Sequence, residues 1–296
     1  MTRPRPAAAA DHWRCAAGDS QITVCARGAE LSAWTFGGRD LLWCPDPAVW
    51  RHTAPILFPI VGRLRDDHTT VGGRHYRIPI HGFAAARRFA LVDRGADRLH
   101  LRLRDTRKTR AAFPFGFRLD VEYRLQALEL TLVFAVANTG GESMPYALGF
   151  HPGFAWPDWS DTGQFAVHFE RDEARQVPQI TGDGLLGRTT RDVPLRQRSL
   201  VLAPSLFEDG ALVFRHAASR RLELPRPGGG TIALAADNFD HWALWARPPA
   251  PFLCAEVLTG HGDYEDFRGA LQERPSMRLL APGAQASHAL TLQLVG

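Results

Sequence analysis

Four residues with acid–base or ligand-binding side chains interrupt apolar stretches bounded by glycine or proline: Arg63, His81, His151 and Glu256. Burial raises the pKa of a carboxyl group, so Glu256, which follows the apolar run 252–255, is a candidate general base. An imidazole exchanges protons near neutral pH, so His81 and His151 are either acid–base groups or hydrogen-bonded core histidines. The guanidinium of Arg63 is expected to bind a buried carboxylate or a ligand oxygen.

Two histidines and a glutamate can also bind zinc or non-haem iron. The histidines at 81 and 151 lie far apart in the sequence, and no pair shows the local His-x-His spacing. The spacing is therefore unlike that of many β-sandwich metal sites, but spacing alone does not exclude a metal-dependent sandwich enzyme, which stays an alternative. We favour a site that contains no metal.

Several other chemistries are excluded by residues that the chain lacks. Lys108 is the only lysine and lies in a polar stretch, which argues against a P-loop and against a Schiff-base enzyme. The run Gly182–Gly187 matches a dinucleotide-binding fingerprint, but no strand–helix context surrounds it, so we interpret it as a loop. Gly-x-Ser-x-Gly and His-Glu-x-x-His do not occur.

The composition is that of an ordinary globular protein, with 45% hydrophobic and 22% charged residues. Its 35 basic residues exceed its 31 acidic residues by only four and are spread along the chain, so nucleic acid is not an expected partner. No apolar run reaches the length of a membrane helix, and the four cysteines are widely spaced. We therefore expect a cytoplasmic protein with free thiols, no membrane contact, and a monomeric or homodimeric state.

The elements that must position the candidate residues are strands. Apolar and polar residues alternate over 118–125 and again over 128–136, which predicts a long antiparallel hairpin. Helical periodicity is almost absent, with one short helix expected over Tyr264–Leu271. We predict a single all-β domain over 1–296, a large antiparallel β-sandwich with less than about 15% helix, preceded by a flexible tail at 1–12. Further strands are expected at 22–26, 99–103, 211–214, 222–224, 231–235, 242–245, 252–257 and 288–295.

Short motifs throughout the chain resemble, in order, those of the aldose 1-epimerase (galactose mutarotase-like) family, most closely its shorter bacterial branch. They are Gly28-Ala29-Glu30-Leu31, Leu42-Trp43, Trp50, the run 55–63, His81-Gly82-Phe83-Ala84, Met144-Pro145-Tyr146, Gly149-Phe150-His151-Pro152 and Leu280-Ala281-Pro282-Gly283. The resemblance covers almost the whole chain. It implies a galactose mutarotase-like supersandwich and a cofactor-free isomerase that interconverts the α and β anomers of a sugar.

The resemblance also implies roles for individual residues. Glu256 would accept the proton of the C1 hydroxyl, and His151 would protonate the ring oxygen. His81 and Arg63 would hold sugar hydroxyls. Asp209 is the candidate for a further hydroxyl-binding carboxylate, although the family's own aspartate aligns with the neighbouring Gly210.

Two departures from the family pattern point to an altered substrate. Gly153 stands where an aromatic residue often follows His-Pro, and Val257-Leu258 stands where Pro-Trp often follows the glutamate. Aromatic rings stack on sugars, so their loss is consistent with a phosphorylated, deoxy or otherwise uncommon sugar. Trp34, Trp242 and Trp245 are either replacement platforms or core residues.

The alternatives are a hexose-6-phosphate 1-epimerase of the same fold and a non-catalytic carbohydrate-binding domain. A phosphate site would draw on arginines such as Arg65, Arg74 or Arg87.

Overall fold

The computed structural model describes residues 11–156, 159, 165–226 and 229–296. About half of the protein is β-strand and about 6% is helix, as the alternating sequence predicts. Of the expected tail, residues 1–10 lie outside the described part. The carbonyl of Asp11 accepts a hydrogen bond from the backbone N–H of Ala26, and the first strand starts at His12.

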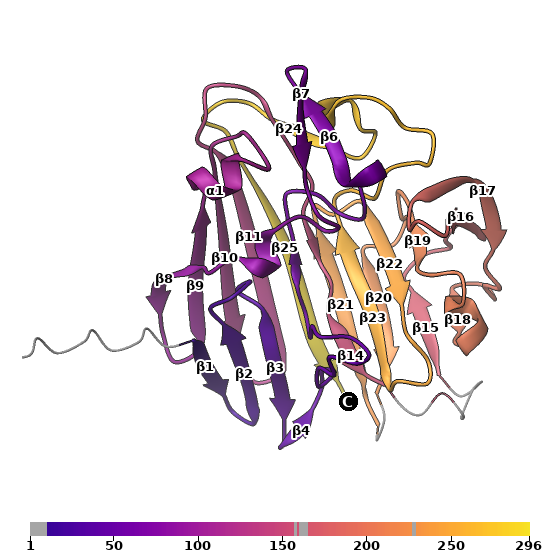
Figure 1. Cartoon of the computed structure of the whole chain (residues 1–296). Helices are drawn as coiled ribbons and strands as arrows, with labels where there is room; N and C mark the ends of the chain where they lie inside the picture. The colour runs from indigo at the N-terminus through magenta and orange to yellow at the C-terminus, as the bar shows by residue number, and fades with distance from the viewer. Residues whose placement is uncertain (1–10, 157–158, 160–164, 227–228) are drawn as a thin grey trace, which may run out of the picture.

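A nine-stranded antiparallel sheet forms one layer of a β-sandwich (Figure 1). The predicted hairpin forms its centre, since Val121 pairs with Phe134 in the register of β10 and β11. Apolar side chains alternate along both strands, so that one face of the sheet is buried. In spatial order the strands are β18 (Ser199–Val201), β15 (Ala166–Phe169), β20 (Arg221–Pro225), β21 (Thr231–Asp237), β25 (Gln285–Val295), β11 (Glu129–Asn138), β10 (Phe117–Leu125), β9 (Arg98–Arg104) and β8 (Ala90–Arg94).

Two smaller sheets pack on that buried face. The six-stranded sheet carries the candidate site and consists of β19 (Leu212–Phe214), β22 (His241–Trp245), β23 (Phe252–Leu258), β13 (Gly149–Phe150) and β5 (Ile56–Leu57), with β14 (Gly153–Ala155) also paired to β23. The four-stranded sheet consists of β1 (His12–Ala17), β2 (Ser20–Cys25), β3 (Leu31–Phe36) and β4 (Arg39–Asp40).

The remaining elements are short. Three two-stranded antiparallel sheets pair β12 (Met144–Tyr146) with β24 (Arg278–Leu280), β16 (Gln176–Ile180) with β17 (Leu186–Asp192), and β6 (His68–Val71) with β7 (Arg74–Arg77). The helices are α1 (Arg107–Arg110) and single 3₁₀ turns at η1 (Arg65–Asp67), η2 (Ala84–Ala86), η3 (Pro204–Phe207) and η4 (Leu271–Glu273). Within the described ranges, no helix has the length and apolarity to cross a membrane.

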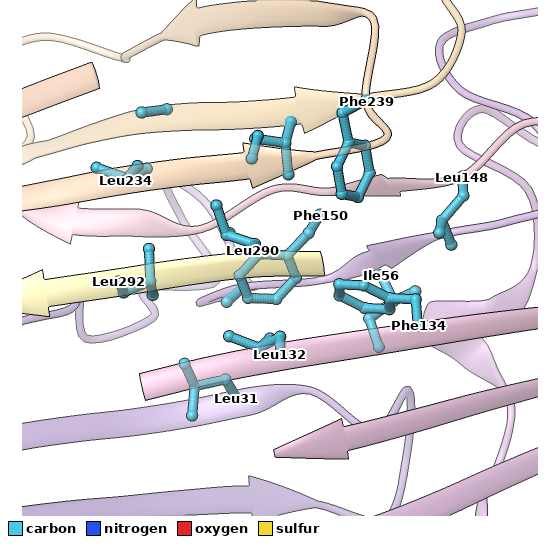
Figure 2. Close-up of a cluster of buried hydrophobic side chains, with 14 of the residues drawn as sticks. Leu31, Ile56, Leu132, Phe134, Leu148, Phe150, Leu234, Phe239, Leu290 and Leu292 are labelled. Atoms are coloured by element: carbon cyan, nitrogen blue, oxygen red, sulfur yellow. The ribbon is translucent and has the colours of Figure 1, made fainter. Parts of the chain in front are cut away.

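One hydrophobic core joins the layers (Figure 2). Phe134 of the nine-stranded sheet lies 5.9 Å, between ring centroids, from Phe150 of the six-stranded sheet. Leu31 of the four-stranded sheet and Leu290 of β25 belong to the same cluster. Phe150 immediately precedes His151, so this core fixes the backbone that carries one of the candidate catalytic groups.

The helix expected at Tyr264–Leu271 does not form. Tyr264 makes a bridge to Leu186, and the backbone N–H of Glu265 donates to the carbonyl of Leu186. These long-range contacts occupy the backbone groups that a helix would use. Only the turn at Leu271–Glu273 is helical.

Candidate active site

A cavity of about 670 Å³ opens beside the six-stranded sheet and contains three of the four residues singled out from the sequence. Glu256 reaches it from β23, His151 from the end of β13, and His81 from the turn before η2. These residues are separated by 70 to more than 100 positions in the chain, so the site is made by the packing of distant strands.

Glu256 lies in the middle of β23, where every residue is buried. Its side chain is only 5% exposed. Removal of the carboxyl group from water raises its pKa to about 8, because the charged form loses more solvation than the neutral form. At neutral pH the carboxyl group therefore holds a proton before substrate binds.

His151 lies directly beside this carboxyl group, with its Nε2 atom 3.3 Å from Oε1 of Glu256. Burial, together with the nearby His81, lowers the pKa of the His151 imidazole well below its usual range. Its backbone N–H donates to the carbonyl of Pro55, while its Nδ1 atom is buried without a hydrogen-bond partner among the described residues. The two side chains thus lie close enough to exchange a proton, which these pKa shifts place on Glu256 at neutral pH.

His81 is held by the adjacent backbone in an uncommon conformation, with φ of 61°. Its Nδ1 atom accepts a hydrogen bond of 3.2 Å from the backbone N–H of Gly62. Burial lowers its pKa to about 4, so the ring is neutral at pH 7 and its proton must be on Nε2. The next residue, Gly82, has no room for a side chain, because a Cβ atom there would lie 2.2 Å from the carbonyl oxygen of Phe58. His81 therefore presents an N–H donor beside His151, at a ring-centroid distance of 5.8 Å.

Arg63 differs from the sequence expectation. Its neighbour Gly62 lines the cavity, but the Arg63 side chain does not. The guanidinium is half-exposed and lies 3.6 Å from the carboxylate of Asp67. An acidic residue four positions away, in the turn η1, thus engages the side chain that we expected to hold a sugar hydroxyl.

Asp209 is also displaced from its expected position. Its carboxylate is 61% exposed and lies 3.9 Å from Arg191, outside the cavity lining. The neighbouring Gly210 and Ala211 line the cavity instead. The turn before β19 therefore contributes no carboxylate to the site.

Two tryptophan rings flank the reactive pair. Trp50 and Trp245 both line the cavity, with ring centroids 5.1 Å and 5.8 Å from that of His151. A Cβ atom at Gly153 would lie 2.6 Å from Cζ3 of Trp50, so the glycine makes room for this ring. Trp34 and Trp242 are core residues with 0% and 2% exposure. Of the three tryptophans considered as replacement platforms, only Trp245 lines the cavity, and Trp50, known from the sequence only as a family motif, lies against Gly153.

Two further histidines of the site were missed. His52 lines the cavity, and its Nδ1 atom lies 3.3 Å from the carboxylate of Glu30, which also accepts hydrogen bonds from the backbone of Thr53 and Ala54. His261 lines the cavity as well, and its carbonyl accepts a hydrogen bond from the buried Arg274. Neither histidine interrupts an apolar run, so local sequence gave no signal.

Basic side chains also lie at the cavity. The exposed Arg27 and Arg51 contribute to its lining, and in the described part of the chain neither makes an ion pair. Arg65 instead faces Asp66, Arg74 lies on the hairpin strand β7, and Arg87 lies over the ring of Phe83. Within the described ranges, no three histidine, cysteine or acidic side chains are placed to hold a metal ion.

Comparison with known proteins agrees with this fold. Residues 11–186 match the family model described as aldose 1-epimerase, and the chain belongs to that family. A relative, protein LacX of Lactococcus lactis, is 28% identical over 257 residues, which cover 83% of this chain and 86% of LacX.

Solved structures of galactose mutarotase-like proteins share this fold. A galactose mutarotase-like protein from Lactobacillus casei superposes with a TM-score of 0.90 at 25% identity, covering 96% of this chain and 99% of that protein. A galactose mutarotase related enzyme from Lactobacillus acidophilus gives a TM-score of 0.87 at 25% identity, with 96% and 97% covered. A putative aldose 1-epimerase from Escherichia coli, 18% identical over 96% of this chain and 98% of that chain, shares the fold with a TM-score of 0.76.

Proposed function

We propose that this protein is an aldose 1-epimerase that interconverts the α and β anomers of a sugar by acid–base ring opening. The observation that carries the proposal is the buried pair of Glu256 and His151, 3.3 Å apart at the wall of a cavity large enough for a sugar. Membership of the aldose 1-epimerase family supports it.

The spacing of the pair suits the reaction. The two oxygens that exchange protons, O1 and the ring oxygen O5, are both bonded to C1 and lie side by side, so two adjacent protein groups can reach both. Movement of the shared proton from Glu256 to His151 gives a carboxylate and an imidazolium. Glu256 then accepts the O1 proton while His151 donates to O5.

As these protons move, the C1–O5 bond breaks and a C1=O double bond forms. Rotation about C1–C2 presents the other face of the carbonyl, and closure reverses both transfers. The pair holds one proton before and after each step, so no external acid or base is consumed. His81, with its Nε2–H, donates a hydrogen bond to a sugar hydroxyl.

The experiment is an anomer-exchange assay by NMR or polarimetry over a panel of free, deoxy and phosphorylated aldoses. We expect the protein to accelerate equilibration of at least one sugar beyond the rate in buffer. Sugar binding without acceleration across the panel would instead support the non-catalytic carbohydrate-binding alternative.

One observation favours a hexose-6-phosphate 1-epimerase as a second candidate. Arg27 and Arg51 line the cavity without a carboxylate partner in the described structure, and arginine suits phosphate recognition. Under this alternative, glucose 6-phosphate should show a lower KM than glucose, and Arg51→Gln should remove the difference.

A further inference from the structure

One part of the cavity surface consists of apolar side chains alone. These residues belong to, or pack on, a single hydrophobic cluster and also line the cavity: Leu57, Val61, Ile180, Leu186, Ala211, Val213, Ala243 and Leu258. We refer to them as the apolar wall. Val213, Ala243 and Leu258 are each less than one-tenth exposed, so the wall is a fixed surface of the fold.

The apolar wall begins beside the reactive carboxyl group. Ala243 of β22 is directly paired with Glu256 of β23, and Val213 of β19 is directly paired with Ala243. Residues paired in this way point to the same face of a sheet, as do residues two apart on one strand, such as Glu256 and Leu258. A sugar whose C1 lies at Glu256 and whose ring lies over β22 and β19 would meet these side chains.

The apolar wall offers no hydrogen-bond partner from a side chain. The polar side chains lining the cavity, within the described residues, are one glutamate, four histidines, two arginines and two tryptophans. Where the expected carboxylate is missing, the carbonyls of Gly210 and Ala211 each already accept a hydrogen bond of 3.0 Å from Arg191. A sugar hydroxyl facing this surface would lose its bonds to water without replacement.

We propose that the substrate is a deoxy sugar, an aldose with CH₂ or CH₃ in place of a hydroxyl-bearing group on the side that meets the apolar wall. This inference rests on the proposed epimerase function and specifies its substrate class. A methyl or methylene group gains from contact with the wall, whereas a hydroxyl group there is penalised.

The test compares kcat/KM for matched sugars that differ by one hydroxyl: galactose with 6-deoxygalactose, glucose with 2-deoxyglucose and with 6-deoxyglucose, mannose with 6-deoxymannose in the L series, and glucose 6-phosphate with its 2-deoxy form. Apolar pockets discriminate such pairs by roughly tenfold to a hundredfold. We expect at least one deoxy sugar to exceed its parent by fivefold or more. If no pair reaches fivefold, the inference is wrong.

Binding separates this inference from the proposed function. Dissociation constants for the same pairs are measured by calorimetry on Glu256→Gln. A fivefold binding preference for a deoxy sugar, without acceleration by the wild-type protein, would contradict the epimerase function and support the deoxy preference. Acceleration by the wild-type protein without any such binding preference would support the epimerase function and contradict the deoxy preference.

Variants of the apolar wall give a second, local test. Val213→Thr replaces a methyl group with a hydroxyl at nearly constant volume, and Ala211→Ser adds one hydroxyl at a half-buried position. Each should lower the deoxy-to-parent ratio at least threefold. Val201→Thr, at an exposed position of the edge strand β18 that does not line the cavity, is the control and should leave the ratio unchanged. An unchanged ratio in both folded wall variants would overturn the inference.

Discussion

Glu256 and His151 hold their proton in the less common arrangement for a carboxyl–imidazole pair. In water the imidazole is the stronger base, but here burial raises the pKa of Glu256 to about 8 and lowers that of His151. The neutral pair avoids two buried charges at rest. The ionised pair that ring opening requires is reached by moving one proton between two atoms that lie 3.3 Å apart.

This arrangement predicts a bell-shaped pH profile for kcat/KM. Above a pH of about 8, the pair loses its single proton and has no acid to offer O5, so the rate should fall. In more acidic solution His151 gains a second proton and the pair lacks a base. Polarimetry between pH 5 and 9.5, after subtraction of the buffer rate, measures both limbs. A rate that continues to rise above pH 9 would contradict the single-proton pair.

The sequence identified His81, His151 and Glu256 because each interrupts an apolar run, and burial of such groups requires a shared polar site. The same reasoning left a carboxylate or a ligand oxygen open as the partner of Arg63, and its guanidinium lies outside the cavity lining, 3.6 Å from the carboxylate of Asp67. The search for apolar runs missed His52, which lines the cavity from a loop whose backbone N–H groups at Thr53 and Ala54 donate to Glu30.

At the scale of elements, Gly153 and Trp50 show how a missing side chain shapes the site. The strand β14 passes so close to the Trp50 ring that only a glycine fits, and the ring packs in turn on His151. The aromatic surface absent from position 153 is thus supplied by a different segment of the chain.

Gly153→Ala should therefore disturb both stability and binding. Its Cβ atom would displace the Trp50 ring, and such overpacking costs about 1–3 kcal/mol of unfolding free energy. We expect a raised KM as well, because the ring lines the cavity. Urea unfolding and sugar kinetics measure the two effects. Gly141→Ala, where a Cβ atom meets nothing within 4 Å, is the control. Equal stability of both variants would show that Trp50 is not fixed by this contact.

Local patterns predicted strands well and long-range pairing poorly. Apolar and polar residues alternate along β10 and β11 because one face of each strand is buried. This signal is contained in neighbouring residues of the sequence. The segment Tyr264–Leu271 was expected to be helical, but its backbone pairs with Leu186, about 80 residues away. Such pairing depends on the assembled fold and leaves no periodic signal.

At the scale of the whole molecule, the site depends on the contact between the nine-stranded and six-stranded sheets. Phe134 and Phe150 meet at the centre of the core shown in Figure 2, one residue from His151. The reactive pair is therefore placed by the same packing that holds the layers together.

Phe134→Ala should destabilise the protein by about 3–5 kcal/mol, since it leaves a cavity beneath β13. The midpoint of urea unfolding measures the loss. Leu128→Ala, at a position 50% exposed in the turn of the same hairpin, should change stability by less than about 0.5 kcal/mol. Similar losses of unfolding free energy for both variants would show that the contact between the two sheets does not stabilise the fold.

If Glu256 exchanges protons with a sugar, the anomer-exchange rate of Glu256→Gln must fall. The amide keeps the shape of the side chain but cannot take up the proton of O1. We expect kcat to fall by about 10²–10⁴-fold, with sugar binding retained and the melting temperature close to that of the wild type. A folded Glu256→Gln protein with the full wild-type rate would contradict a catalytic role for Glu256.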